Sequence, residues 1–192
     1  HKYNPDKSVA SSWHPWIKGD KLELPIQEDE TALVIWVLWK HFDKYRDIEF
    51  IQPLYRGLII KAAEFMIKFV DKETKLPLPS YDLWEERHGI HTFTVSAVIA
   101  GIQAAGHFAS AFGEHDRAKK YFSVAGEMKD AMVKYLYNKT ENRFARMGTK
   151  NGCDYELDMT IDASLYGLFS FCVFSPQDPL VQSTMQAVKN ML

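Results

Sequence analysis

Residues 93–112 read FTVSAVIAGIQAAGHFASAF and are followed directly by Gly113. Apolar residues recur through this stretch at three- and four-residue spacing, which indicates a helix. Gly101 and Gly106 lie within it, and residues this small let a neighbouring helix approach closely. We therefore predict a helix that is buried on most of its sides and is ended by Gly113.

Two helices are predicted before this stretch. An acidic loop over residues 23–30 leads into the first, whose apolar residues share one face: Ala32, Ile35, Trp36, Trp39 and Phe42. The two Trp residues have the spacing of a buried stripe, so we expect both to be structural. Residues 47–70 form the second helix, in which Pro53 is tolerated near the first turn. Its buried side is expected to carry Ile51, Leu54, Leu58, Phe65, Met66 and Phe69.

The helical pattern continues after residue 113. The predicted elements are, in order, an amphipathic helix over residues 114–136, a small hairpin over 137–144, an acidic loop over 154–162 and a helix over 162–174. A last helix begins with Asp178 as N-cap and Pro179 at the first helical position. The predicted helices thus come in pairs joined by short turns.

Each odd-numbered helix follows a loop that carries carboxylates and aromatic side chains. In a ring of helical hairpins whose odd members face inward, these three loops, over residues 23–30, 81–87 and 154–162, would meet at one end. Polar and aromatic side chains gathered at such a mouth are typical of a ligand pocket. We therefore predict an all-α fold with its site at this end.

The chain has 192 residues, 46% of them hydrophobic, and a formal net charge of −2. This length suits one domain, and the balanced charge gives no reason to expect a nucleic acid or a membrane as partner. Apolar runs such as residues 33–39 fall short of the ~20 residues of a membrane span. Cys153 and Cys172 are expected to be free thiols in a reducing compartment, which favours a cytoplasmic location. His1 stands where a Met would start the chain, so we expect the native N-terminus to be missing.

The stretch PSYDLWEERHGIHTFT, residues 79–94, concentrates the chemistry of the chain. Two adjacent carboxylates, Glu85 and Glu86, stand between Trp84 and Arg87. A carboxyl group that protonates a glycosidic oxygen at neutral pH needs a raised pKa, which a neighbouring like charge and an apolar wall supply. An indole offers the sugar ring an apolar platform. The alternative is that these acidic residues only complement the dipole of the helix that follows.

The same stretch contains His88-x-x-His91, the nearest pattern to a metal motif. A zinc-binding pair on a helix has its histidines at another spacing, and no third ligand accompanies these two. We therefore expect neither a metal nor another cofactor.

Three segments together resemble glycoside hydrolase family 15. They are residues 24–34 (LPIQEDETALV), residues 80–94 (SYDLWEERHGIHTFT) and residues 161–169 (IDASLYGLF). This is the family of glucoamylases, glucodextranases and some microbial trehalases, and the chain is similar to its prokaryotic, oligosaccharide-acting branch. The resemblance implies an (α/α)6 barrel, of which residues 1–192 would be an interior slice of about half. It also implies release of glucose from non-reducing ends with inversion.

The resemblance further implies roles for individual residues. Glu85 is the expected general acid, and Glu86 is expected to hold substrate hydroxyls beside the scissile bond. The substrate is also expected to contact Tyr81, Asp82, Trp84, Arg87, Gln27, Asp29, Trp13 and Trp16. An inverting enzyme needs a second carboxylate that activates water, and this base is expected outside the chain. Asp158 and Asp162 lie at the right end, but Asp162 has the position of an N-cap, and we assign the base to neither.

Two other classes of protein are compatible with the sequence. One is a sugar-binding scaffold that has the same fold without catalysis, and the other is a different (α/α)6 enzyme such as a disaccharide phosphorylase, although no phosphate cradle is visible. Starch oligosaccharides, isomaltose-type linkages and trehalose all stay open as substrates. The 192-residue chain on its own is expected to be inactive and to self-associate through the apolar flanks of a half ring.

Overall fold

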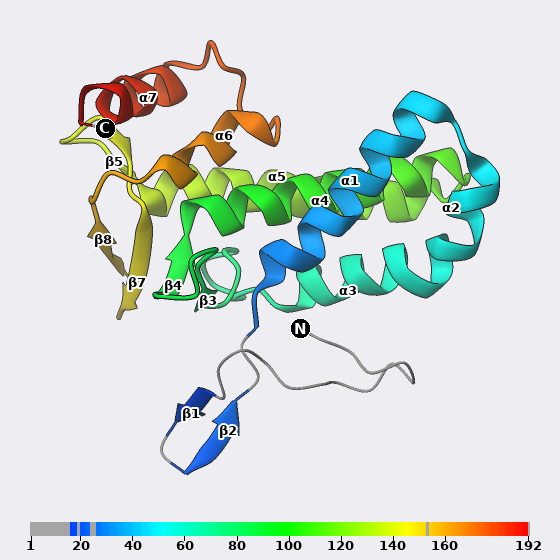
Figure 1. The fold of residues 1–192 in the computed structure, drawn as a ribbon, viewed down its shortest axis with the longest axis horizontal. Helices are drawn as coiled ribbons and strands as arrows, with labels where there is room; N and C mark the ends of the chain where they lie inside the picture. The colour runs from blue at the N-terminus through cyan, green and yellow to red at the C-terminus, as the bar shows by residue number, and fades with distance from the viewer. Residues whose placement is uncertain (1–15, 19, 24–25, 153, 192) are drawn as a thin grey trace.

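The computed structural model describes residues 16–18, 20–23, 26–152 and 154–191, and helices dominate it (Figure 1). The helical segments are α1 Glu28–Tyr45, α2 Ile48–Leu54, the π-helical turn η1 Tyr55–Ile59, α3 Ile60–Lys68, α4 Thr92–Ala111, α5 His115–Leu136, the 3-10 turn η2 Ala163–Tyr166, α6 Gly167–Ser170 and α7 Pro179–Met191. The strands are β1 Trp16–Lys18, β2 Lys21–Glu23, β3 Ser80–Tyr81, β4 His88–His91, β5 Tyr137–Asn138, β6 Arg143–Phe144, β7 Met147–Asn151 and β8 Asp154–Asp158.

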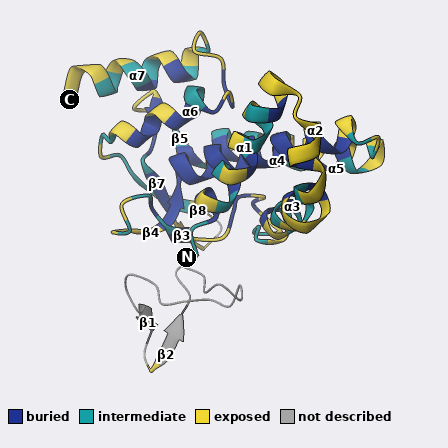
Figure 2. Ribbon diagram, turned by 45° about the vertical axis from the view of Figure 1, so that its right-hand side comes forward, coloured by how far each residue is buried: buried dark blue, intermediate teal, exposed yellow. Residues whose placement is uncertain are grey.

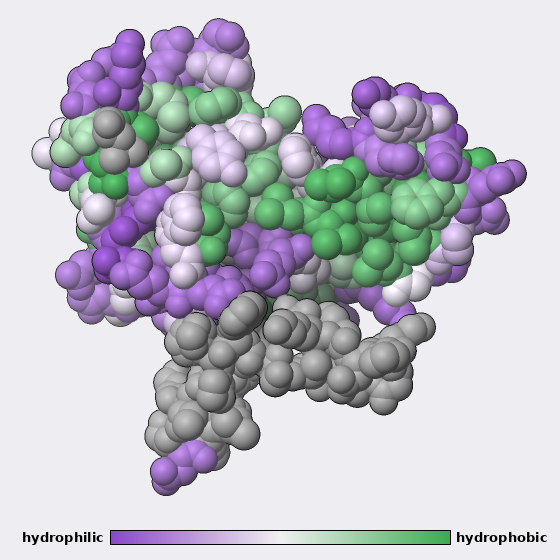
Figure 3. Space-filling model, in the orientation of Figure 1, coloured by the Kyte–Doolittle hydropathy of each residue, from purple (hydrophilic) through white to green (hydrophobic). Residues whose placement is uncertain are grey.

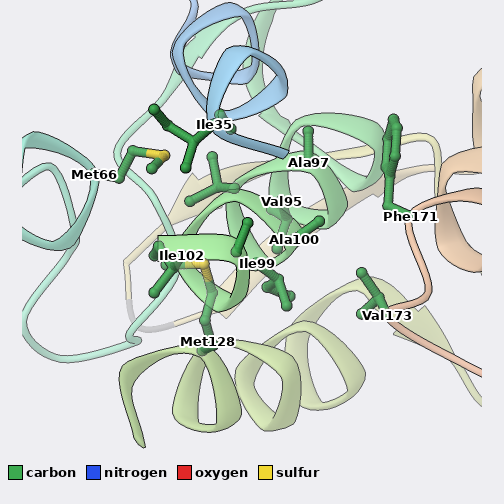
Figure 4. Close-up of a cluster of buried hydrophobic side chains, with 14 of the residues drawn as sticks. Ile35, Met66, Val95, Ala97, Ile99, Ala100, Ile102, Met128, Phe171 and Val173 are labelled. Atoms are coloured by element: carbon green, nitrogen blue, oxygen red, sulfur yellow. The ribbon is translucent and has the colours of Figure 1, made fainter. Parts of the chain in front are cut away.

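Helix α4 is the centre of the fold, and it is buried on most of its sides, as its sequence predicts. It packs mainly against α1 and α5 and also contacts α3 and α6, and most of its residues are buried. Figure 4 shows Val95 and Ile99 of α4 among side chains from neighbouring elements, including Ile35 of α1 and Met128 of α5. The 20 residues of α4 reach the length of a membrane span, which no run of the sequence was expected to do, but 89% of the apolar window is buried inside the protein.

Helices α1 and α4 come into backbone contact at Gly101. A Cβ atom placed on Gly101 would lie 2.8 Å from the Cα atom of Ala32 and 2.9 Å from its carbonyl oxygen. Gly106 leaves room in the same way for Phe122 of α5, whose ring comes within 2.8 Å of the position of a Cβ atom. The prediction that small residues of this stretch permit close helix contact is therefore confirmed.

The helical run that contains Pro53 has one wide turn. Pro53 has no N–H to donate, and the chain passes directly after it into the π-helical turn η1. The extra residue of a π-turn shifts every later position by one, so Ile59 and Met66 are buried. Leu58 and Phe65, which strict helical spacing placed on the buried side, are instead 38% and 37% exposed. That part of the prediction was wrong.

A four-stranded antiparallel sheet, in the order β3-β4-β7-β8, lies at one end of the helices (Figure 1). The sequence analysis did not predict it, because residues 154–158 of strand β8 were assigned to a loop. The helix predicted over 114–136, the hairpin over 137–144 and the start of the last helix at Pro179 are confirmed by α5, the β5–β6 pair and α7.

The helix predicted over residues 162–174 is much shorter than expected. Asp162 is its N-cap, as predicted, and accepts a hydrogen bond from the Ser164 amide at 2.7 Å. Helix α6 nevertheless ends at Ser170. Cys172 has a φ of 60°, which a right-handed helix cannot contain, and its thiol is free and exposed.

Exposed large apolar side chains gather on α1 and α2. Val34, Val37, Tyr45, Ile48 and Phe50 are each between 47% and 60% exposed. Figure 2 shows exposed residues along α1, α2 and α3, and Figure 3 shows an apolar surface in this region of the molecule. Contiguous apolar surface of this kind usually marks an interface.

The contact at Gly101 predicts a pair of opposite mutational effects. Gly101→Ala forces α1 and α4 apart and should lower the free energy of unfolding by about 1–3 kcal/mol. Gly126→Ala is the matched control, because nothing lies within 4 Å of a Cβ atom at that helical position, and it should raise the same free energy by up to about 1 kcal/mol. Urea unfolding followed by circular dichroism measures both. Equal stabilities of the two variants would show that the helices are not in contact at Gly101.

The exposed apolar surface predicts that the isolated 192-residue chain self-associates. Light scattering should give a mass that rises with protein concentration. Val37→Glu places a charge at an exposed apolar position of α1 and should shift the chain towards the monomer, whereas Ser123→Glu, at an exposed position of α5, should not. A wild-type chain that stays monomeric at all concentrations would contradict the prediction.

Candidate active site

The loop over residues 82–87 joins β3 to β4 and is folded around Asp82. The Asp82 carboxylate accepts hydrogen bonds from the backbone amides of Glu86 and Arg87 at 2.8 and 3.2 Å. The Asp82 carbonyl accepts the Glu85 amide at 2.9 Å, and the Asp82 amide donates to the Arg87 carbonyl at 3.0 Å. Asp82 is 5% exposed. It therefore shapes the loop from the inside.

Glu85 stands at the most constrained point of this loop. Its φ of 57° lies in the left-handed region, a conformation that costs a residue other than glycine on the order of 1–3 kcal/mol and persists where the surroundings hold it. Glu85 is half-buried, whereas Glu86 and Arg87 are exposed, and Trp84 is 57% exposed. The loop thus presents two adjacent carboxylates, a cation and an indole, the set of groups that suits a sugar.

The three predicted loops meet at this place. The Gln27 side-chain amide donates to the Asp82 carbonyl at 3.0 Å, and the Tyr81 backbone amide donates to the Ile26 carbonyl at 3.4 Å. Asp162, from the third loop, lines a small cavity together with Asp82. The prediction that the loops cluster at one end of the helices is confirmed.

Two of the predicted site residues cannot be placed. Trp13 lies outside the described residues, and so does the side chain of Trp16, whose backbone belongs to β1. The structural Trp residues of α1 are both half-buried: Trp36 packs edge-on against Phe171, and Trp39 stacks on His107. Both pack against the core, as expected.

The spaces around the loop differ in size. The cavity beneath it, lined in part by Trp84, His91 and Arg146, holds about 10 Å³, which is room for about one water molecule. An open groove of about 490 Å³ lies on the sheet and is lined by Arg87, His88, Met147, Thr149, Glu156, Leu157 and Asp158. Of these two spaces, both lined by described residues, the groove is the one large enough for a sugar unit.

Arg146 is a residue of the site that the sequence analysis missed. Its guanidinium forms an ion pair with Asp158 and lies 3.9 Å from Asp162. Burial raises the pKa of Asp158, but hydrogen bonds from Thr160 and from Arg146 outweigh this and lower it to about 2. Asp158 is therefore an ionised partner of Arg146, and Asp162 is occupied as the N-cap of η2. Arg146 lies eight residues before the acidic loop over 154–162, and nothing in its immediate sequence marks it as a site residue.

Two buried carboxyl groups lie at the start of α1. Glu28 is 1% exposed, neither of its carboxylate oxygens has a hydrogen-bond partner among the described residues, and burial raises its pKa to about 8. Asp29 is 2% exposed and accepts hydrogen bonds from the Thr94 hydroxyl at 3.0 Å and the Glu30 amide at 2.9 Å. Burial raises its pKa to about 6. Glu28 is therefore protonated at neutral pH, and Asp29 ties α1 to α4.

The two histidines of the predicted His88-x-x-His91 pattern have different surroundings. His88 is exposed, whereas His91 is 3% exposed and its Nε2 atom lies 3.1 Å from the Arg87 carbonyl oxygen. Burial lowers the pKa of His91. Within the described part of the chain, no group of three or more His, Cys, Asp or Glu residues is arranged to hold a metal ion.

Paired helices with a carboxylate-rich loop at the N-terminal ends of α1 and α4 are the arrangement of an (α/α)6 fold. The chain belongs to Glycosyl hydrolases family 15, whose sequence profile matches residues 13–192. A bacterial glucoamylase solved in complex with acarbose has the same fold, with a TM-score of 0.66 and 23% identity over 88% of this chain and 26% of its own.

Two curated relatives agree with this assignment. An uncharacterized glycosyl hydrolase of Methanocaldococcus jannaschii is 28% identical over 186 residues, which are 95% of this chain and 28% of that protein. A glucoamylase of a Clostridium species is 26% identical over 195 residues, covering 92% of this chain and 26% of that protein. The chain therefore spans about a quarter of the length of the curated relatives it matches.

Burial of Glu28 predicts that stability falls as the pH rises. The Glu28 carboxyl keeps its proton in the folded protein up to a pKa of about 8, whereas the unfolded chain loses it near the ordinary pKa of 4.5. Between pH 4.5 and 8 the folded state thus binds more protons than the unfolded chain. The free energy of unfolding therefore decreases as the pH rises through this range. The slope from this group is about 1.2 kcal/mol per pH unit at pH 7 and about 0.7 at pH 8, where half of the folded molecules have lost the proton. Glu28→Gln should remove most of that slope.

Thermal or urea unfolding at pH 7.0, 7.5 and 8.0 measures this effect. Asp29, with its pKa of about 6, is ionised in both states over this interval and adds little to the slope. Glu127→Gln, an exposed carboxyl on α5, is the control and should leave the slope unchanged. A Glu28→Gln variant with the slope of the wild type would show that Glu28 is ionised in the folded protein.

Proposed function

We propose that the full-length protein carrying this chain is a glycosidase that releases glucose from the non-reducing ends of α-glucosides with inversion. Membership of Glycosyl hydrolases family 15 supports cleavage of a glycosidic bond, and the relatives named glucoamylase support an α-glucoside as substrate. The observation that carries the proposal is the loop over 82–87, in which Glu85 and Glu86 stand side by side next to Trp84.

Glu85 is the proposed general acid, which gives its proton to the glycosidic oxygen as the bond to the anomeric carbon breaks. The backbone of Glu85 is held in an uncommon left-handed conformation by the hydrogen bond to Asp82. This fixes the backbone position from which the Glu85 side chain extends. Glu86 holds sugar hydroxyls through an exposed carboxylate, and Trp84 offers an exposed indole face to the ring.

The general base of the reaction is proposed to come from outside residues 1–192. Inversion needs a second carboxylate about 6.5–9.5 Å from the acid, free to take a proton from water. Asp158 is paired with Arg146, and Asp162 accepts the Ser164 amide at the start of η2. Neither carboxylate is free for the task, which supports a base elsewhere in the protein.

An oligosaccharide is the proposed substrate rather than the disaccharide trehalose. The groove of about 490 Å³ begins at Arg87, two residues after the proposed acid, and runs along the sheet. Its rim offers hydroxyl, carboxylate and cationic groups from Thr149, Glu156 and Arg87. A substrate of two sugar units would leave part of such a groove empty, whereas a longer glucan would fill it.

Substitution of the two carboxyl groups in the full-length protein tests these roles. Glu85→Gln should lower kcat on maltooligosaccharides by about 10²–10⁴-fold, because the proton donor is lost, and leave binding of the substrate in place. Glu86→Gln should raise KM more than it lowers kcat. Glucose release under saturating and limiting substrate measures both.

The matched control for these substitutions is Glu127→Gln, which changes an exposed carboxyl on α5 and should keep full activity. Activity of Glu85→Gln within about tenfold of the wild type would exclude Glu85 as general acid. A wild-type protein that binds maltooligosaccharides and never releases glucose would instead identify a sugar-binding scaffold.

A further inference from the structure

The loop over residues 82–87 is held at both ends by side chains that do not belong to it. At its first residue, the Asp82 carbonyl accepts a hydrogen bond from the Gln27 side-chain amide at 3.0 Å. At its last residue, the Arg87 carbonyl lies 3.1 Å from the Nε2 atom of His91. Because a carbonyl can only accept, Nε2 of His91 carries the proton and donates. The two ends of the loop thus receive equivalent bonds from outside.

The two donors occupy corresponding positions in the fold. Gln27 is the N-cap residue of α1 and His91 is the N-cap residue of α4, the two helices that meet at Gly101. An N-cap side chain normally accepts a hydrogen bond from an amide of its own helix. Neither Gln27 nor His91 does so. Both side chains reach to the loop instead of capping their helix.

Each donor is itself firmly placed. The backbone of His91 pairs with Met147 of β7, and the ring is almost fully buried. The charged groups that face this ring are the Asp82 carboxylate from the loop and the Arg146 guanidinium from the far side of the cavity. Gln27 is half-buried, and the residue before it accepts the Tyr81 backbone amide. The bonds to the loop therefore start from anchored positions.

We propose that Gln27 and His91 are positioning residues that clamp the loop by its two ends and so set the orientation of the Glu85 carboxyl. Gln27 acts through the Asp82 carbonyl, which also accepts the Glu85 amide. His91 acts through the Arg87 carbonyl, which also closes the loop onto the Asp82 amide. The part that concerns catalysis rests on the proposed function, whereas the clamp itself does not.

The clamp predicts a specific pattern of kinetic effects. A catalytic group displaced by about 1 Å can lose on the order of a hundredfold in rate while substrate binding persists. Gln27→Met, which keeps the length of the side chain and removes its donor, and His91→Leu should each lower kcat about 10- to 100-fold with KM within about threefold of the wild type. His91→Gln restores an N–H donor and should recover most of the lost kcat.

Amide hydrogen exchange of the full-length protein tests the clamp independently of activity, because it measures how firmly the loop amides are held. The amides of Glu86 and Arg87 are bonded to the Asp82 carboxylate inside the loop. Their exchange should be about three- to tenfold faster in Gln27→Met and His91→Leu, in line with the net loss of one hydrogen bond, and should return to the wild-type rate in His91→Gln. Gln103→Leu, on α4 and away from the loop, is the matched control and should change neither exchange nor kcat.

The outcomes separate the clamp from the proposed function. Unchanged exchange of both amides in Gln27→Met and His91→Leu would overturn the clamp, whatever the activity. Faster exchange in a protein that hydrolyses no glucoside at all would keep the clamp and reject the proposed function. If His91→Leu does not fold, Gln27→Met decides, because its half-buried position tolerates the change. Faster exchange with full kcat would show that the clamp orders the loop without positioning Glu85.

Discussion

The site depends on the backbone contact between α1 and α4. Because Gly101 has no side chain, the two helices cross with Ala32 directly against it. The start of α1 is then close enough to α4 for the Asp29 carboxylate to accept the Thr94 hydroxyl, a buried bond between residues 65 positions apart. This brings the N-cap residues of both helices under one loop. The close crossing therefore determines where the paired carboxylates of that loop lie.

The same region carries several features that reduce stability. Among the described residues Glu28 is buried without a hydrogen-bond partner, Glu85 has a left-handed backbone, and neither the Gln27 nor the His91 side chain caps its own helix. Each of these costs free energy, and such costs collect where surrounding structure holds a functional geometry in place. The extensive packing of α4 against α1 and α5 buries apolar surface, which stabilises the fold and offsets these costs. The packed helices α1, α4 and α5 thus support the less stable region around the loop over 82–87.

Local periodicity explains which elements the sequence could predict. Helix ends depend on residues that are close in sequence. Those predicted to within a residue or two are the boundaries of α4 and α5, the stop at Gly113 and the caps at Asp162 and Asp178. The wide turn after Pro53 and the sheet of β3, β4, β7 and β8 depend on a change of helical register and on pairing between distant segments. The spacing of apolar residues predicts neither a change of helical register nor pairing between distant strands.

The site shows the same division. Adjacent carboxylates beside an indole identify the loop around Glu85 in the sequence, because the residue types alone indicate this chemistry. Gln27 was predicted to line the substrate and His91 was considered only as a metal ligand, whereas their bonds to the two end carbonyls of the loop arise from the crossing of α1 and α4. Asp158 and Asp162 are the complementary case. In sequence they are further carboxylates near the acid, and in the structure the ion pair with Arg146 and the bond to the start of η2 already occupy them. The described residues thus hold the loop of the proposed acid together with its supports, and the proposed base has to be brought to this loop by residues outside this chain.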